Sequence, residues 1–347
     1  MQPVYEVIVI GAGQAGIAMS QQLQSDGIDN HIMLDNHKRI GDSWRLRYTS
    51  LVLFTPRSYS SLPRLEMNGD PESFPTKDEM ADYLETYVEH FQLPYQLGVK
   101  VIKVEKQANY FEVHTSQGIL NANQVVVASG AFQQPYVPSV IENDAATSHL
   151  HTSEYKDSSS LNSGSVLIVG GGNSGAQIAV ELSNICEVTL SISHQPKFLP
   201  LKVVGKSIFN WLEKLRLLYA GTDTKRGKLF QKQNDPIFGK ELKQAIRRKQ
   251  VKIKPRVIKV DGANVTFKDG SKLQADQVIW ATGFTPSYKM IDIEGAIDEN
   301  GKPLHKRGVS PIDGLYYIGL PWQHSRGSAL ICGVGKDSEY LMRQLKS

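Results

Sequence analysis

Two glycine-rich turns with the spacing G-x-G-x-x-G stand far apart in the chain, and each follows a short run of valine, leucine and isoleucine. Glycine at these positions lets a buried strand turn tightly into a helix, and it lets a diphosphate group approach the main chain. The N-terminus of the helix then offers free N–H groups and a partial positive charge. Each turn therefore predicts a dinucleotide-binding site. The glycines are Gly11, Gly13 and Gly16 in the first turn and Gly170, Gly172 and Gly175 in the second.

The residues that end the second strand of each unit differ, and the difference predicts two different dinucleotides. Asp35 ends the stretch "HIMLD", where a carboxylate accepts hydrogen bonds from the hydroxyl groups of an adenosine ribose, as in FAD or NAD. The matching residues 191–194 read Ser-Ile-Ser-His, with Lys197 just beyond them and no acid. Hydroxyl groups and cations there favour a 2'-phosphate, so we expect Ser193 and His194 to contact NADPH rather than NADH.

The two turns belong to a longer internal repeat, and this repeat predicts the fold. Each half continues with the sequence Val-Ile-Lys-Val, at residues 101–104 and 257–260. A short antiparallel meander follows, and then a strand that ends in Ala-Ser-Gly (128–130) or Ala-Thr-Gly (281–283). We therefore expect an α/β protein with two Rossmann-like dinucleotide-binding domains, each with a small antiparallel β-meander.

Positive charge is concentrated in one segment. The chain of 347 residues has a formal net charge of +4, but residues 197–259 hold 18 Lys and Arg against four Asp and Glu. We expect a mostly helical basic insert at residues 197–250, with a solvated face near an anionic cofactor. Peripheral contact with an anionic membrane is the weaker alternative. Nucleic acid is not expected, because aromatic and basic residues are not interleaved as in a binding module.

The remaining composition narrows the class of protein. A hydrophobic content of 40% is enough for a sizeable core, and no apolar run approaches the roughly 20 residues of a membrane helix. Cys186 and Cys332 form neither a C-x-x-C pair nor a metal-ligand spacing. We therefore expect a soluble cytoplasmic protein with no metal site and no redox-active dithiol.

The order of the motifs resembles the two-dinucleotide flavoproteins, and within them the flavin-containing (class B) monooxygenases and their bacterial CzcO-like subgroup. The resemblance covers nearly the whole chain. It rests on "GDSWRLRYTSLVLFTPRSYSSLP" (41–63), "FPTKDEMADYLETYVEHFQLP" (74–94), "PIFGKEL" (236–242), "VIWATGFTP" (278–286) and "GLYYIGLPWQHSRGSALICGVGKD" (314–337).

The resemblance implies where each cofactor binds. An FAD domain would comprise residues 1–155 plus 284–347, and an NADPH domain residues 156–283. Residues implied for the FAD domain and its hinge are Gly11, Gly13, Gln14, Ala15, Gly16, Asp35, Gly41, Ser43, Trp44, Arg45, Val101, Ala128, Ser129, Gly130 and Trp322. Those implied for the NADPH domain and its hinge are Gly170, Gly172, Asn173, Ser174, Gly175, Ala281, Thr282 and Gly283, with Ser193 and His194 at the 2'-phosphate.

Two side chains are candidates for a direct catalytic role. Gln323, beside Trp322, would approach the isoalloxazine ring. Arg57 would act as a guanidinium near the flavin, or it would hold a phosphate or an ion pair, which is the interpretation we favour. In the insert, the apolar spacing of residues 207–220 predicts a helix that faces the core or another subunit, with a substrate lid or a membrane-touching helix as the alternatives.

Departures from the family pattern leave the activity open. Only the second half of the fingerprint F-x-G-x-x-x-H-x-x-x-[FY] is present, at His151 and Tyr155, while Ala145 and Thr147 replace the phenylalanine and the glycine. The resemblance implies a monooxygenase in which FAD, reduced by hydride from NADPH, captures O2 as a C4a-hydroperoxide. That species would oxygenate a small soft nucleophile or a carbonyl compound.

Two other activities stay in view. The first alternative is an NADPH-dependent flavin reductase that passes electrons to a protein, a quinone or another acceptor without a redox disulfide. A flavin-based sensor without turnover ranks last. We expect the monooxygenase, with a small-molecule substrate and O2 as its partners, and leave a homodimer open.

Overall fold

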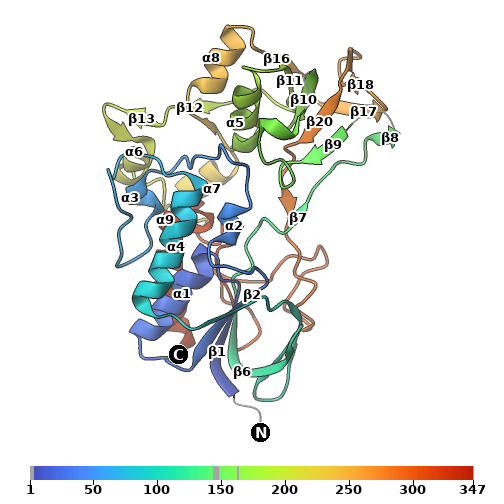
Figure 1. Cartoon of the computed structure of the whole chain (residues 1–347). Helices are drawn as coiled ribbons and strands as arrows, with labels where there is room; N and C mark the ends of the chain where they lie inside the picture. Colours follow the sequence, from blue (N-terminus) through green and yellow to red (C-terminus); the bar gives the residue numbers. More distant parts are fainter. Residues whose placement is uncertain (1–3, 144–147, 162–163, 347) are drawn as a thin grey trace.

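The computed structural model describes residues 4–143, 148–161 and 164–346, which form two α/β units joined by two crossings of the chain (Figure 1). The first unit has a seven-stranded sheet with β1 at its centre. β1 pairs in parallel with β2 and β6, and the C-terminal strand β22 pairs in parallel with the end of β6. The strands are β1 (Val4–Ile10), β2 (His31–Asp35), β3 (Tyr95–Leu97), β4 (Val101–Lys106), β5 (Phe111–Thr115), β6 (Gly118–Val127) and β22 (Leu315–Tyr317).

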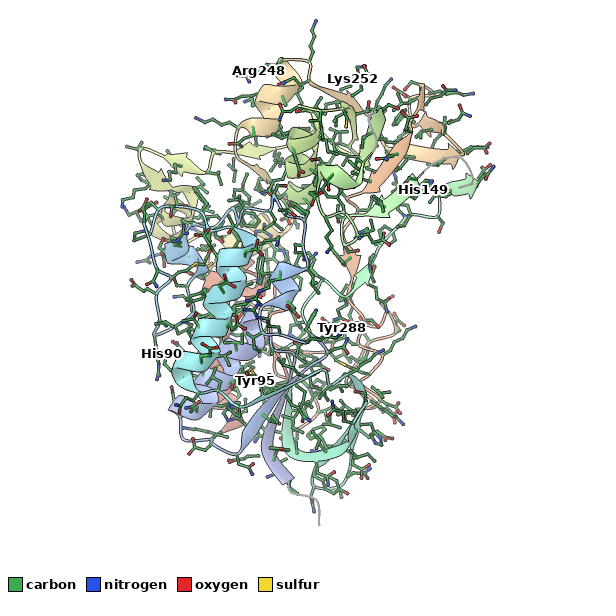
Figure 2. The ribbon with its side chains drawn as sticks, in the orientation of Figure 1. His90, Tyr95, His149, Arg248, Lys252 and Tyr288 are labelled. Carbon is green, nitrogen blue, oxygen red and sulfur yellow. The ribbon has the colours of Figure 1, made fainter. Side chains whose placement is uncertain are left out.

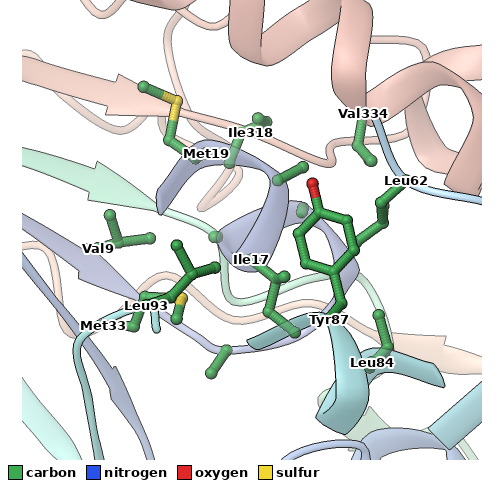
Figure 3. Close-up of a cluster of buried hydrophobic side chains, with 14 of the residues drawn as sticks. Val9, Ile17, Met19, Met33, Leu62, Leu84, Tyr87, Leu93, Ile318 and Val334 are labelled. Carbon is green, nitrogen blue, oxygen red and sulfur yellow. The ribbon is translucent and has the colours of Figure 1, made fainter. Parts of the chain in front are cut away.

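The alternation of side chains along β1 gives this unit two cores. Val7 and Val9 pack against the helices, and Ile8 and Ile10 pack against the meander of β4, β5 and β6. Figure 3 shows the helical side, where side chains from three helices meet over the sheet. Each large apolar side chain fully buried here stabilises the fold by about 1.5–3 kcal/mol. The helices of this unit are α1 (Gln14–Ser25), α2 (Asp42–Arg45), α3 (Arg57–Ser60), α4 (Lys77–Phe91), the 3₁₀ turn η2 (Arg326–Ala329) and α9 (Ile331–Leu345).

The second unit repeats this plan. Its parallel sheet packs against α5 and α8 on one face and, on the other, against a second sheet in which an antiparallel meander carries one parallel edge strand. In spatial order the parallel strands are β16 (Val251–Lys254), β11 (Glu187–Ser191), β10 (Ser165–Val169), β20 (Gln277–Trp280) and β9 (Ser148–His151). The other sheet holds β19 (Lys272–Gln274), β18 (Asn264–Phe267), β17 (Val257–Asp261) and β8 (Ile141–Asn143), and the helices are α5 (Asn173–Leu182), α8 (Glu241–Arg247) and the 3₁₀ turn η1 (Ser158–Ser160). This architecture confirms the expected α/β class with two Rossmann-like units.

The chain crosses between the units at β7 (Gln134–Pro135) and β21 (Phe284–Thr285), which pair with each other. The first crossing differs from the expected boundary after residue 155. β8 and β9 lie before that boundary, yet they hydrogen-bond to strands of the second unit. Both strands are short and pair with partners more than 100 residues away, so local sequence patterns do not reveal them.

The basic insert is less helical than expected. Its helices α6 (Ile208–Lys214), α7 (Lys225–Gln231) and α8 have seven residues each. The insert also holds two short strand pairs. β13 (Lys202–Val203) pairs with β14 (Lys206–Ser207) before α6, and β12 (Phe198–Leu199), also before α6, pairs with β15 (Ile237–Phe238), which lies between α7 and α8.

The single apolar helix face expected over residues 207–220 is therefore wrong. α6 ends at Lys214, Leu215 is 59% exposed, and Arg216 has a positive φ of 55° that interrupts the helix. Leu218 instead packs in a buried cluster with Tyr59 and Phe209. At the outer end of the second unit, Arg248 and Lys252 extend from the surface (Figure 2).

Candidate functional site

The backbone of the first turn requires two of its three glycines. Gly11 has a φ of +109°, and a Cβ there would lie 2.6 Å from the carbonyl oxygen of Ala128. A Cβ on Gly16 would lie 1.8 Å from the carbonyl oxygen of Gly11. Gly13 has an ordinary φ of −78°, and a Cβ there would meet no atom within 4 Å. Gly13 thus leaves open space before the N-terminus of α1, as a diphosphate needs.

The ribose end of this site is built around Asp35. Its Oδ2 accepts a hydrogen bond from the Ala12 N–H at 2.7 Å, and its Oδ1 accepts one from the His37 N–H at 2.8 Å. His37 Nδ1 lies 2.7 Å from Oδ1. Burial opposes the charged form of Asp35, but the hydrogen bonds from His37 and Ala12 outweigh it and lower the pKa of the carboxyl. A small pocket adjoins this ionised carboxylate and includes Gly41 and Ser43 in its wall.

The second turn has the same geometry. Gly170 has a φ of +127°, and a Cβ there would lie 2.2 Å from the carbonyl oxygen of Ala281. A Cβ on Gly175 would lie 2.1 Å from the carbonyl oxygen of Gly170, whereas Gly172 again faces open space. No side chain caps α1 or α5 among the described residues. Both helix N-termini therefore offer their first N–H groups to an anion.

The second site differs where the ribose would lie. Ser193 and His194 are exposed, and Ser193 Oγ lies 3.0 Å from His194 Nδ1. The neighbouring Ser191 is buried and donates to the carbonyl oxygen of Pro255 at 2.8 Å. No carboxylate follows β11 in this stretch, so this site lacks the acid that Asp35 supplies in the first.

Two residues expected at the second turn also hold neighbouring segments. The Asn173 side chain donates to the carbonyl oxygen of Pro236 at 3.2 Å and accepts from the Phe238 N–H at 2.9 Å. Its amide group is thus occupied by the insert, which leaves its backbone N–H for a cofactor. Ser174 lies beside Tyr48 of the first unit, whose hydroxyl donates to Gln177 Oε1 on the same helix at 2.9 Å.

Residues 128–130 pack against the first glycine turn, and residues 281–283 pack against the second. Each of these segments then leads into one of the two strands where the chain passes between the units. Gln133 Nε2 donates to Ser129 Oγ at 3.1 Å and to the Gly130 carbonyl oxygen at 2.8 Å. Thr282 Oγ1 donates to the carbonyl oxygen of Tyr136. The Gly283 carbonyl oxygen faces His151 Nε2 at 2.9 Å, which places the remaining fingerprint histidine at the second crossing. The fingerprint positions Ala145 and Thr147 lie outside the described residues.

The segment after Gly41 is anchored by ion pairs. Gly41 has a φ of +85°, and a Cβ there would lie 2.6 Å from the carbonyl oxygen of Ala81. Arg45 Nη2 lies 2.8 Å from Asp82 and 2.9 Å from Glu85, both on α4. The Arg45 guanidinium therefore fixes α2 on α4. Two further residues implied for FAD, Trp44 and Val101, are half-buried against the cores of the first unit.

The contacts of Arg57 favour the ion-pair interpretation over the catalytic one. Its Nε donates to the Asn68 carbonyl oxygen at 2.8 Å, and its Nη1 donates to Ser73 Oγ at 2.6 Å. Its Nη2 pairs with Glu79 in the first turn of α4. All three nitrogen atoms are thus used by the loop that follows α3 and by the first turn of α4.

The other catalytic candidate, Gln323, is buried in the C-terminal segment. Its Oε1 accepts from the Leu320 N–H at 3.3 Å. Trp322 has a positive φ of 59° and packs edge-on against Phe230 of the insert. A bulky residue in this conformation is strained, which is a feature of many functional sites.

One residue of this region was missed by the sequence analysis. The Arg47 guanidinium carbon lies 4.6 Å from the ring centroid of Phe132 and 4.9 Å from that of Phe284, which flank the two crossings. Burial lowers the pKa of Arg47, and no carboxylate lies within 4.0 Å of it in the described part of the chain. In the sequence, Arg47 cannot be told apart from the nearby Arg45. Only the long-range contacts with Phe132 and Phe284 show that Arg47 lies between the two strands that connect the units.

Two family descriptions match consecutive parts of the chain. Residues 8–200 match "Pyridine nucleotide-disulphide oxidoreductase", and residues 197–311 match "Flavin-binding monooxygenase-like". The chain therefore belongs to the flavin monooxygenase family and is an oxidoreductase. The two descriptions confirm a flavin and a pyridine nucleotide as the expected kinds of cofactor. Cys186 and Cys332 form no disulfide.

Within that family the chain belongs to the CzcO-like subgroup. It is 51% identical over 346 residues to the "Uncharacterized oxidoreductase CzcO-like" of Geobacillus kaustophilus, with 99% of both chains covered. It is 47% identical over 344 residues to the oxidoreductase CzcO of Bacillus subtilis, again with 99% of both covered. The "Probable indole-3-pyruvate monooxygenase YUCCA7" of Arabidopsis thaliana is 28% identical, covering 93% of this chain and 84% of its own.

Solved structures share the fold over the whole chain. A flavin-containing monooxygenase from Stenotrophomonas maltophilia has a TM-score of 0.83 and 26% identity, covering 100% of this chain and 99% of its own. The bacillithiol disulfide reductase of Bacillus cereus, at 18% identity, shares the fold with a TM-score of 0.76 and 99% coverage of both. No helix in the described ranges is long and apolar enough to cross a membrane.

Proposed function

We propose that this enzyme is an NADPH-dependent flavin monooxygenase that holds FAD at the first glycine turn and NADPH at the second. The observation that carries the proposal is the contrast between two turns of equal geometry. The first adjoins the ionised, hydrogen-bonded Asp35, and the second adjoins Ser193 and His194 with no acid.

The residues present fit these two groups. The open space at Gly13 and Gly172 lets a diphosphate reach the uncapped helix N-termini, whose N–H groups bind its oxygens. Asp35 accepts hydrogen bonds from ribose hydroxyl groups. In the second unit the hydroxyl and imidazole groups of Ser193 and His194 donate to a 2'-phosphate, which a carboxylate would repel.

The overall reaction conserves atoms and electrons. A substrate S reacts with NADPH, H⁺ and O2 to give SO, NADP⁺ and H2O. The flavin supplies hydride acceptance and oxygen activation, and the chain supplies binding, orientation and exclusion of water. We propose a small soft nucleophile or a carbonyl compound as the substrate. The name of the YUCCA7 relative, an indole-3-pyruvate monooxygenase, supports the carbonyl class.

The reductase alternative keeps support from one specific observation. The fingerprint lacks its phenylalanine and glycine, and the remaining His151 is occupied by the Gly283 carbonyl oxygen. In this alternative the second cofactor still reduces the first, but the electrons leave to an acceptor other than O2.

The two activities separate in the reaction of the reduced enzyme with O2. The flavin is bleached anaerobically with NADPH, O2 is admitted, and the return of the oxidised-flavin absorbance is followed together with H2O2 release. A monooxygenase gives a slow return of the absorbance in the absence of substrate, because residues around the flavin would exclude water from it. Immediate return with stoichiometric H2O2, and fast electron transfer to a quinone, would support the reductase instead.

A further inference from the structure

The two units are joined by a narrow connection, so other contacts must fix their relative orientation. The crossings β7 and β21 pair with each other over two residues each. Units of one chain that are connected in this way move relative to each other unless an interface holds them. The distance between two cofactors, one on each unit, therefore depends on the residues packed against the crossings.

Arg47 of the first unit lies against both crossings. Its guanidinium carbon lies 4.6 Å from the ring centroid of Phe132, just before β7, and 4.9 Å from that of Phe284, the first residue of β21. The two rings meet edge-to-face, with their centroids 5.3 Å apart. His151 of the second unit packs edge-to-face with Phe284, with ring centroids 4.9 Å apart. We call these four residues the junction stack, because they connect one unit with the other through both crossings.

The charge of Arg47 has no partner outside the junction stack. Its Nε donates to the Ser43 carbonyl oxygen at 3.3 Å, and neither terminal nitrogen has a hydrogen-bond acceptor or a carboxylate partner within the ranges that the structure describes. Burial lowers the pKa of Arg47, so water only partly solvates its charge. A cation is attracted to the faces of aromatic rings more strongly where water is excluded. The rings of Phe132 and Phe284 are therefore the groups that compensate this charge.

Residues 48–52, next in the chain, hold the second unit by another route. The Tyr48 hydroxyl donates to Gln177 Oε1 at 2.9 Å, and Gln177 Nε2 donates to the Val52 carbonyl oxygen at 2.9 Å. Gln177 lies on α5, the helix that begins at the second glycine turn. The first unit thus holds the helix on which the proposed NADPH site is built.

The segment that carries Arg47 also adjoins the proposed FAD site. Ser43, whose carbonyl oxygen accepts from Arg47, lines the small pocket beside Asp35. Tyr48, the residue after Arg47, reaches the helix of the other site. A short path of contacts therefore leads from one proposed cofactor site to the other, and Arg47 lies on this path.

We infer that Arg47 is a positioning residue, which through the junction stack fixes the angle at which the two cofactors meet. The inference rests on the proposed function, in which NADPH, H⁺ and FAD give NADP⁺ and FADH2. A transfer of this kind requires reacting atoms about 3–3.5 Å apart, and a misplacement of about 1 Å slows a reaction about a hundredfold. Loss of the Arg47 side chain should therefore slow the transfer and leave both glycine turns intact.

Two replacements of Arg47 test the inference. The rate of anaerobic flavin bleaching is measured at saturating NADPH, and the affinity of the FAD-loaded proteins for NADP⁺ is measured by calorimetry. Arg47→Gln should bleach at least about tenfold more slowly, with unchanged FAD content and an NADP⁺ affinity within about threefold of the parent. Arg47→Lys keeps a cation beside the rings and should recover part of the rate.

Lys106→Gln is the matched control. Lys106 Nζ lies 4.1 Å from the ring centroid of Phe111 in the meander of the first unit, so this variant removes a cation–π contact of similar length away from the crossings. Its bleaching rate should equal that of the parent. An unchanged rate in Arg47→Gln would overturn the inference. A loss confined to NADP⁺ affinity would also overturn it, because the Arg47 charge would then belong to a phosphate of the cofactor.

A double-mutant cycle shows whether Arg47 acts through the rings. Phe132 is 68% exposed, so Phe132→Leu removes its ring without a cavity in the core. The combined variant should be faster than the product of the two single effects on the bleaching rate predicts, because both changes break the same contact. Fully multiplicative effects would overturn the role of the junction stack.

A measurement without catalysis reports the orientation of the units directly. Spin labels are attached at Tyr95→Cys on the first unit and Arg248→Cys at the outer end of the second (Figure 2), in a Cys186→Ser background. Both label positions are exposed. The parent should give one narrow distribution of distances between the labels, and Arg47→Gln a broader or shifted one. Identical distributions would overturn the inference.

The outcome is separable from that of the proposed function. Flavin reduction by NADPH precedes the reaction with an acceptor in the monooxygenase and in the reductase alike, so Arg47→Gln should slow this step in either case. A parent protein that NADPH fails to bleach would refute the proposed function. A parent and an Arg47→Gln variant that are bleached equally fast would refute only the role of Arg47.

Discussion

Gly13 and Gly16 stand in the same turn, and the structure predicts opposite consequences for their replacement by alanine. Gly13→Ala places a methyl group in open space at an ordinary φ of −78°. The loss of a favourable helix N-cap costs up to about 1 kcal/mol, and the stiffer unfolded chain gives back about 0.4–1 kcal/mol. The free energy of unfolding without cofactor should therefore change by less than about 1 kcal/mol. The methyl group nevertheless fills the space for the diphosphate, so FAD should bind at least about tenfold more weakly.

Gly16→Ala tests the packing of the same turn. The new Cβ would lie 1.8 Å from the Gly11 carbonyl oxygen, so the helix and the turn must move apart. Overpacking of this kind costs about 1–3 kcal/mol or more, and the loss should appear with or without FAD.

The assay combines denaturant unfolding of the cofactor-free proteins with the FAD absorbance retained after dialysis. Full FAD retention by Gly13→Ala would refute the placement of the diphosphate. A Gly16→Ala protein as stable as the parent would refute the close packing of the turn.

Three further predictions concern side chains around the two sites. Replacement of Ser193 and His194 by alanine should raise the KM for NADPH and spare NADH, and an unchanged ratio would mean that the 2'-phosphate is held elsewhere. The pKa of His37 is raised chiefly by its hydrogen bond to Asp35, so the charged pair stabilises the fold below the ordinary histidine pKa and is lost as pH rises through the raised value. His37→Ala should thus lower Tm more at pH ~6 than at pH ~9, and an equal loss at both would contradict the pairing. Arg57→Gln removes its ion pair to α4 and should lower Tm while the rate of flavin reduction by NADPH is unchanged; a collapse of that rate at normal Tm would restore its catalytic role.

The turns and the repeat could be predicted from the sequence because their signals are local. The requirement for glycine at position 16 follows from the close approach of its Cβ position to the Gly11 carbonyl oxygen within the same turn. The antiparallel meanders could be predicted because their short strands follow one another along the chain and are joined by short turns. Asp35 ends a strand of clear hydrophobic character, so its place beside the first turn could also be predicted.

The remaining features depend on contacts between distant segments. β9 has four residues and belongs to the second unit only because it pairs with β20. This pairing has no signal in the local sequence, so the predicted boundary after residue 155 lies too late in the chain. The Asn173 side chain holds the insert at Pro236 and Phe238, although its place in the glycine turn suggests a cofactor ligand. A cavity beside Cys332 is formed by three segments that only the fold brings together.

The central claim is that FAD resides at the first glycine turn and NADPH is received at the second. Gly172→Ala tests it directly, because its Cβ meets no protein atom within 4 Å and its φ is an ordinary −85°. The purified variant is analysed for bound FAD and then titrated anaerobically with NADPH until the flavin is bleached. We predict full FAD content and at least about a tenfold increase in the NADPH concentration needed for half-maximal bleaching rate. Loss of FAD from this variant with an unchanged NADPH dependence would contradict the account.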